Sequence, residues 1–354
     1  MILPTEPIGS IPRPIELIEA IAALGDYADP RLEPLYEQAI ADTIERFEAT
    51  GSPVVTDGEQ RKYHNFWTYC VHGLSNTAPD GFKIPFAAGH VRHMPRLTAG
   101  PFRYKVYADR YLDAAMHYAH APVKQAVISP SALSLMYPAE GIPDYPREQF
   151  IDDLLSEHET EVRRCLEKGA HCVQIDFTEG RLAVKLDPSG HLLNSFIDLN
   201  NLALSRFSAD ERKRIGVHTC PGGDRESTHS GDVDYAELLP SLLRLRATNF
   251  YIALAGEKDR ARVLKIIRDN MNRDQKIFVG VVAPIDPRIE TPEEIRDHIL
   301  EAAKYIPIEQ LGTTDDCGFS PFSDDISTSR DTAFAKIRAR VIGAALARDL
   351  IGGR

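Results

Sequence analysis

Residues 277–282 read IFVGVV, an unbroken run of apolar side chains in which β-branched residues predominate. A strand of a parallel sheet is covered by helices on both faces, so it is apolar throughout instead of alternating with polar residues. The run therefore predicts a buried parallel strand. Seven shorter runs of the same kind occur along the chain, at residues 7–10, 53–56, 125–128, 172–175, 215–218, 250–253 and 310–313.

Amphipathic segments lie between these runs. Apolar residues recur at helical spacing over residues 32–47, 150–166, 235–243 and 295–302, and a last helix is expected over about 332–350. Thr291 followed by Pro292 predicts a helix start, with a threonine cap and proline at the first helical position. Eight strands alternating with helices favour a single (β/α)8 TIM barrel, an α/β fold spanning residues 1–354, over an open sheet.

Residues 60–122 break the alternation. Aromatic and basic side chains mix there without a clear period, between the second and third predicted strands. We expect a long insertion over the barrel mouth, containing a hairpin. Loops of this length are usually functional, but a structural cap is an equally good interpretation of the pattern.

Composition excludes several classes of protein. The net charge of −11 and the lack of a basic stripe argue against nucleic-acid binding. No apolar run reaches the roughly 18 residues of a membrane helix, and the first residues do not resemble a signal peptide. Five thinly spread cysteines predict no disulfide framework and favour the reducing cytoplasm, where cysteine more often serves metal binding or catalysis. The oligomeric state is left open.

Metal-capable residues follow two of the predicted strands. His218 and Cys220 are two residues apart at the end of the fifth strand, so both can face the same side, and Cys317 follows the eighth strand. Catalytic residues of a barrel lie at these carboxyl ends. One imidazole and two thiolates form a set that prefers zinc and leaves one position open for a substrate. The alternative is that both cysteines are small buried residues.

Five short motifs carry a family resemblance: residues 8–10 (IGS), 57–59 (DGE), 174–176 (QID), 218–220 (HTC) and 316–318 (DCG). They occur in the order seen in the catalytic barrel of cobalamin-independent methionine synthase. From residue 8 to about residue 345 the chain resembles one such barrel. It is most similar to the shorter, single-barrel group of that superfamily, which also contains epoxyalkane:coenzyme M transferase.

The resemblance implies roles for six residues. The family's zinc (Zn2+) ligands match His218, Cys220 and Cys317. Its contacts to the amino-acid end of homocysteine match Ser10, Glu59 and Asp176, and carboxylates are suited to pair with a substrate ammonium. For Glu59 and Asp176 the alternative is a supporting role or an ion pair inside the barrel.

Two departures from the family pattern stand out. The synthases carry a glutamate zinc ligand at the end of the sixth strand, whereas here Glu257 comes a few residues late and could either reach back to the metal or cap the next helix. They also carry a histidine for proton transfer after the seventh strand. Here Asp286 is the candidate for that catalytic role, although Asp-Pro is also an ordinary turn.

The resemblance therefore implies a zinc-dependent S-methyltransferase that methylates homocysteine to methionine with a methyltetrahydrofolate-like donor. The altered ends of the sixth and seventh strands leave open another zinc-dependent thiol alkyltransferase or a thioether-cleaving lyase. A non-catalytic barrel that binds a metal or a small ligand is the third hypothesis.

Overall fold

The computed structural model describes residues 3–62 and 65–352 and contains a sheet of six parallel strands. Within this sheet, each strand pairs with the sheet strand that follows it in chain order, so successive strands are neighbours. In chain order the strands are β5 (Gln125–Ile128), β6 (Val173–Asp176), β7 (Ile215–Thr219), β10 (Asn249–Ile252), β11 (Lys276–Val282) and β12 (Leu311–Asp315).

Six of the eight predicted strands are confirmed, within one or two residues at each end. The predictions at residues 7–10 and 53–56 were wrong, because neither run forms a strand. Thr5, just before the first run, and Val55, within the second, instead make single parallel bridges, to Thr313 and Val123 at the two edges of the sheet. Both runs contain proline, and the first also contains glycine, which weakens regular pairing.

The two edge segments also contact each other. The Thr56 hydroxyl donates to the Gly9 carbonyl at 2.8 Å, and the Ile11 amide donates to the Gly58 carbonyl at 3.0 Å. These bonds place residues 9–11 beside residues 56–58. The turns that follow the two runs, with their polar side chains, are therefore held next to one another.

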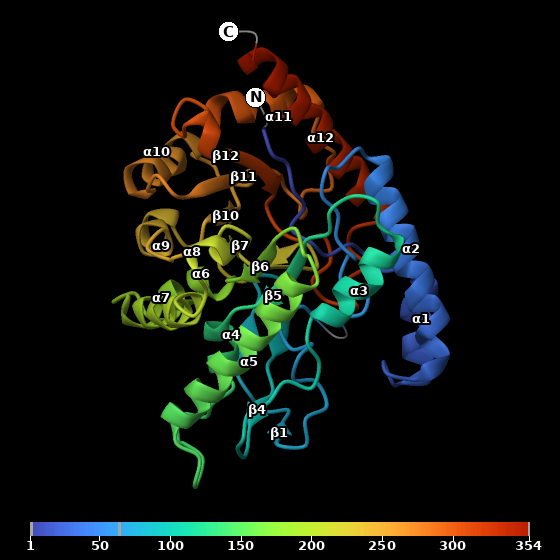
Figure 1. Cartoon of the computed structure of the whole chain (residues 1–354), viewed down its shortest axis with the longest axis vertical. Helices are drawn as coiled ribbons and strands as arrows, with labels where there is room; N and C mark the ends of the chain where they lie inside the picture. Colours follow the sequence, from blue (N-terminus) through green and yellow to red (C-terminus); the bar gives the residue numbers. More distant parts are fainter. Residues whose placement is uncertain (1–2, 63–64, 353–354) are drawn as a thin grey trace.

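Helices surround the sheet, as Figure 1 shows, and both chain ends lie at the same side of the molecule. Within the described residues, no helix is long and apolar enough to cross a membrane. The α-helices are α1 (Ile15–Leu24), α2 (Glu33–Ala49), α3 (Asp109–Tyr118), α4 (Pro130–Ser134), α5 (Arg147–Glu167), α6 (Glu179–Leu186), α7 (His191–Leu204), α8 (Ala209–Arg212), α9 (Tyr235–Leu242), α10 (Arg260–Asn270), α11 (Pro292–Ala302) and α12 (Arg330–Gly352). Two 3-10 turns, η1 (Pro30–Leu32) and η2 (Ile308–Gln310), complete the helical segments.

The start of α11 confirms the helix signal in the sequence. The Thr291 side chain accepts from the Glu294 amide, and the Glu294 carboxylate accepts from the Thr291 amide. This reciprocal pair satisfies two amides that the helix itself cannot. Pro292 occupies the first helical position, where it costs no hydrogen bond.

The segment between Val55 and β5 contains two short antiparallel pairs and α3. The pairs are β1 (Thr77–Ala78) with β4 (Arg96–Leu97), and β2 (Lys83–Pro85) with β3 (Val91–His93). A third small hairpin, β8 (Gly223–Asp224) with β9 (Ser227–Thr228), follows β7. The amides of Ala87 and Ala88 bond to this hairpin at 3.0 Å each. These bonds hold residues 87–88 against the hairpin that follows β7.

Candidate metal centre and active site

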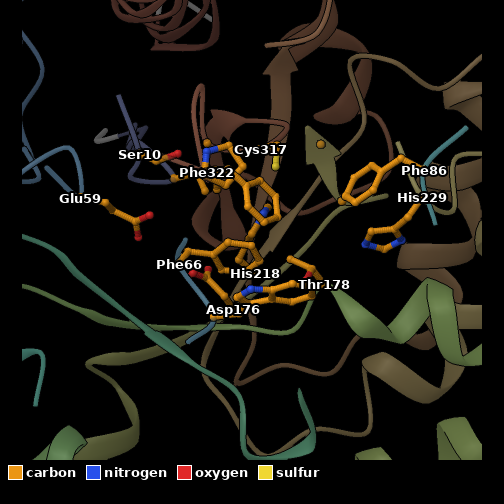
Figure 2. A pocket seen from close by; sticks show the side chains of 16 residues that line it. Ser10, Glu59, Phe66, Phe86, Asp176, Thr178, His218, His229, Cys317 and Phe322 are labelled. Carbon is orange, nitrogen blue, oxygen red and sulfur yellow. The ribbon is translucent and has the colours of Figure 1, made fainter. Parts of the chain in front are cut away.

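His218, Cys220 and Cys317 lie together at the carboxyl ends of β7 and β12. Their ligand atoms all lie within 4.8 Å of one another, and the two sulfurs are 3.2 Å apart without a disulfide. Parallel strands end at the same edge of the sheet, so residues 97 positions apart in the sequence can meet there. Figure 2 shows His218 and Cys317 facing the same cavity.

The orientation of His218 suits a metal ligand. Its Nδ1 lies 3.3 Å from the carbonyl oxygen of Tyr251, to which it can donate. Its Nε2 is buried and has no hydrogen-bond partner among the described residues. A ligating histidine commonly gives its other ring N–H to a carbonyl in this way, which leaves one lone pair for the metal. The unpaired nitrogen and the two adjacent sulfurs therefore fit a soft divalent cation.

The two thiols differ in acidity. The Cys220 thiol, next to Cys317 and buried, has a pKa raised well above its usual value. The hydrogen bond from Cys220, together with His218, lowers the pKa of Cys317 well below its usual value. Ionisation of Cys317 is thus favoured over that of Cys220, and a bound cation would stabilise both thiolates.

Asp316 fixes the backbone next to this cluster. Its carboxylate accepts the amides of Leu254, Ala255 and Gly256 at 2.7–2.8 Å, which fixes the turn after β10 beside Cys317. A Cβ on Gly280 would lie 1.9 Å from the Asp316 carboxylate. The single glycine within the apolar run of β11 is therefore required for the close approach of this carboxylate.

A cavity of about 490 Å³, measured with its open mouth, lies in front of the cluster. Ser10, Glu59 and Asp176 line it together with His218 and Cys317, so most of the predicted site residues share one space. The Ser10 hydroxyl accepts from the Ser320 amide at 3.2 Å and keeps its own proton free to donate. Figure 2 shows Ser10 and Glu59 on one side of the cavity and His229 on the other.

The two acidic residues of the cavity have different partners. The Glu59 carboxylate forms a buried ion pair with Lys62 at 2.8 Å. Although burial lowers it, the pKa of Lys62 is raised by Glu59 and Asp176, so the ammonium persists. Among the described residues, Asp176 accepts from the Gln174 amide at 2.7 Å, and burial raises its pKa to about 6. Asp176 is therefore the less neutralised of the two carboxylates.

Glu257 and Asp286 do not reach the cluster. Glu257 pairs with the buried Arg181 at 2.8 Å, and Asp259, not Glu257, caps α10. Asp286 accepts from the Arg288 amide at 2.9 Å, its side chain is 44% exposed, and it is not among the residues that line the cavity. Glu257 is held by Arg181, and Asp286 is held in its own turn beside Arg288, so neither carboxylate is directed to the cluster.

Glu257→Gln should leave the bound metal unchanged, because its partner is Arg181 and not the cluster. The amide keeps one hydrogen bond but loses the charge, so we expect stability to fall by roughly 1–2 kcal/mol. Metal content by elemental analysis and a thermal melt check both statements. Loss of a stoichiometric metal would restore Glu257 as a ligand.

His229 was missed by the sequence analysis although it lines the cavity. Its Nδ1 lies 2.8 Å from the Ser230 hydroxyl, and a Cβ on Gly222 would lie 1.8 Å from its Nε2. Burial, with Lys185 and Arg181 nearby, lowers the pKa of His229 to about 3, so the ring is neutral near pH 7. It comes from the loop after β9, and nothing in the sequence pattern marked that loop.

Comparison with known proteins agrees with this arrangement. The family model for the catalytic domain of cobalamin-independent synthase matches residues 3–332. Uncharacterized protein YxjH of Bacillus subtilis is 26% identical, with 94% of this chain and 91% of that protein covered. Methionine synthase of Sulfurisphaera tokodaii is 23% identical, with 98% and 93% covered.

Solved structures show the same fold. A B12-independent methionine synthase from Shewanella, in complex with selenomethionine, superposes with a TM-score of 0.77 at 18% identity, covering 100% of both chains. A putative vitamin-B12 independent methionine synthase from Listeria monocytogenes gives 0.72 at 20% identity, covering 98% of both chains. The chain belongs to the family of the cobalamin-independent synthase catalytic domain.

Proposed function

We propose that this protein is a zinc-dependent methyltransferase that transfers a methyl group to homocysteine and forms methionine. The observation that carries the proposal is the meeting of His218, Cys220 and Cys317 at a cavity that also holds Asp176. Membership of the synthase family and relatives named methionine synthase support it. We also propose that the edge segments at Thr5 and Val55 complete a (β/α)8 barrel over residues 1–354, with residues 60–122 as the insertion.

His218 Nε2 and the sulfurs of Cys220 and Cys317 would hold the zinc ion. When bound, such an ion leaves a fourth position for a substrate thiol and makes it a thiolate at neutral pH. The protein contributes the tautomer of His218 through the Tyr251 carbonyl. It also contributes the fixed position of Cys317 through Asp316.

The amino-acid end of homocysteine would bind in the part of the cavity lined by Asp176 and Ser10. Asp176 is available to pair with the ammonium, and the Ser10 hydroxyl can donate to the carboxylate. Glu59, which already pairs with Lys62, would hold that lysine and the turn at residues 57–59 in place. Its contribution to the ammonium would be correspondingly smaller.

Asp176→Asn should raise the KM for homocysteine roughly 10- to 100-fold, since a hydrogen bond to a charged group contributes about 1.5–3 kcal/mol. Initial rates over a range of homocysteine concentrations measure this. Glu59→Gln is the matched control. It should lower the melting temperature, because it leaves the buried Lys62 without its carboxylate. It should raise KM less than Asp176→Asn does. Equal KM values for wild type and Asp176→Asn would remove Asp176 from the substrate site.

Product analysis tests the activity itself. The zinc-loaded protein is incubated with homocysteine, cysteine or 2-mercaptoethanesulfonate and several methyl donors, and the thioethers are identified by mass spectrometry. Methionine formation supports the proposal. Alkylation of another thiol and never of homocysteine would favour a different thiol alkyltransferase, the reading supported by the positions of Glu257 and Asp286. Purified protein that binds no zinc would favour the non-catalytic hypothesis.

A further inference from the structure

Gln174 lies inside β6, two residues before Asp176, so both side chains point to the same side of the strand. The Gln174 side chain is fully buried and is not among the residues that line the cavity. Its amide nitrogen donates to two acceptors at once, the Asp176 carboxylate at 2.7 Å and the Ile8 carbonyl at 3.1 Å. One buried amide therefore joins β6 to the segment of residues 7–10.

These two acceptors fix the orientation of the Gln174 amide. An ionised carboxylate and a carbonyl only accept, so the nitrogen must face them with both hydrogens and Oε1 must face away. Within the described part of the chain, Oε1 is buried and has no hydrogen-bond partner. A buried oxygen without a partner is unfavourable, and such an atom in a folded protein calls for an explanation. The explanation lies on the nitrogen side of the amide, where both contacts lead to the cavity.

The two contacts reach the two halves of the proposed amino-acid site. Asp176 lines the cavity as the acceptor for a substrate ammonium, and Ser10, two residues after Ile8, lines it as the donor to a carboxylate. Figure 2 shows Asp176 and Ser10 among the side chains around this space. The Gln174 amide binds Oδ1 of Asp176 and leaves Oδ2 for a ligand. The same amide thus holds the ammonium acceptor and the backbone next to the carboxylate donor.

The segment of residues 7–10 depends on such attachments because it does not form a strand. From the edge of the sheet, the Thr56 hydroxyl donates to the Gly9 carbonyl at 2.8 Å. Gln174 holds the same segment from β6, a strand whose neighbours in the sheet are β5 and β7. The amide is therefore a direct link between the two halves of the site, in addition to the edge contacts.

We propose that Gln174 is a positioning residue that sets the spacing between Asp176 and Ser10 and so selects a thiol with both charged ends of an α-amino acid. The inference rests on the proposed function, because it concerns the amino-acid end of the same substrate. Glutamine suits this role because its planar NH2 group offers two donors in a fixed geometry. Gln174 acts through the residues that it holds and not by touching the substrate.

Three thiols separate the two halves of the site. Homocysteine carries both charged groups, 4-mercaptobutyrate lacks the amino group, and 3-mercaptopropylamine lacks the carboxylate. Binding of each thiol to the zinc-loaded protein is measured by calorimetry without a methyl donor, so that no turnover occurs. We expect the wild type to bind homocysteine most tightly, because only homocysteine engages Asp176 and Ser10 together.

Gln174→Met removes both hydrogen bonds and keeps a side chain of similar length. It should raise the Kd of homocysteine roughly tenfold, the effect of losing hydrogen bonds that hold a charged partner. A thiol with one charged end does not span the two halves, so the Kd values of 4-mercaptobutyrate and 3-mercaptopropylamine should change much less. If Gln174→Met does not fold, Gln174→Asn takes its place, because its amide is one methylene too short to reach both acceptors.

Gln275→Met is the matched control. Gln275 is similarly buried and donates to the Leu243 carbonyl at 2.8 Å, but it precedes β11, at the end of the sheet away from the cavity. It should lower the melting temperature and leave all three Kd values unchanged. A role of Gln174 in stability alone would make the two methionine variants alike.

A double-mutant cycle shows whether Gln174 acts through Asp176. In the Asp176→Asn protein the ammonium has lost its carboxylate, so adding Gln174→Met should raise the Kd of homocysteine little further. Residues that act together give such non-additive effects, whereas independent residues give additive ones. Additive losses in the double variant would overturn the proposal.

The outcomes separate this inference from the proposed function. If the wild type binds homocysteine and 4-mercaptobutyrate equally well, the ammonium has no site, and the proposed function fails together with the inference. If the wild type prefers homocysteine and Asp176→Asn removes that preference, the amino-acid site stands. A folded Gln174 variant that then binds all three thiols like the Gln275→Met control would overturn the inference alone.

Discussion

Cys220→Ser and Cys317→Ser should each lose bound zinc and lower the rate of methyl transfer more than roughly 100-fold. Removing a residue that only supports a ligand costs up to about 100-fold, and these two residues are the proposed ligands themselves. Both sulfurs belong to the three-residue cluster, and a hydroxyl is a poor ligand for a soft cation. The parallel strands around them should be unaffected by the exchange of one atom. Zinc content, initial rates and far-ultraviolet circular dichroism measure the three expectations.

Cys165→Ala is the matched control. Cys165 is as buried as Cys220 but lies in α5, outside the cluster. It should keep full zinc and full activity at a modest cost in stability. Full zinc in either serine variant would contradict the assignment of the ligands.

Asp316→Ala should be strongly destabilising and should also weaken zinc binding, although Asp316 is not a ligand. The substitution leaves three amides without their acceptor, at about 1–3 kcal/mol for that of the buried Leu254 and less for those of Ala255 and Gly256, which are closer to solvent. It also releases the turn beside Cys317, and loss of such a supporting contact typically costs roughly 10- to 100-fold in metal affinity. Chemical denaturation and competition with a chelator measure the two effects.

Gly280→Ala tests the same contact from the opposite side. A methyl group there would lie 1.9 Å from the Asp316 carboxylate, so it must displace either the carboxylate or the strand. We expect it to reproduce the loss of zinc affinity with every ligand and Asp316 still present. If Asp316→Ala and Gly280→Ala both bind zinc like the wild type, Asp316 does not position Cys317.

The central strands could be predicted from the sequence because burial on both faces leaves an unmistakable apolar run, as in β11. The two edge segments could not. Their residues make few regular pairs, and the polar turn at Ser10 contacts Ser320, which lies far along the chain. Periodicity records the local environment of a residue and not such distant partners.

The same distinction explains the site. His218, Cys220 and Cys317 were predictable because strand ends converge in any parallel barrel. The pairing of Glu257 with Arg181, and of Glu59 with Lys62, depends on side-chain geometry that spacing does not encode. The ring of Phe66 contacts that of Phe322, far along the chain, so the sequence indicated aromatic residues over 60–122 without this partner.

X-ray absorption at the zinc edge, with and without homocysteine, tests the central claim most directly. The account predicts one nitrogen and two sulfur ligands in the free protein, and one additional sulfur when homocysteine is added. An unchanged number of sulfur ligands upon addition of homocysteine, or a zinc ion surrounded only by oxygen and nitrogen, would contradict it.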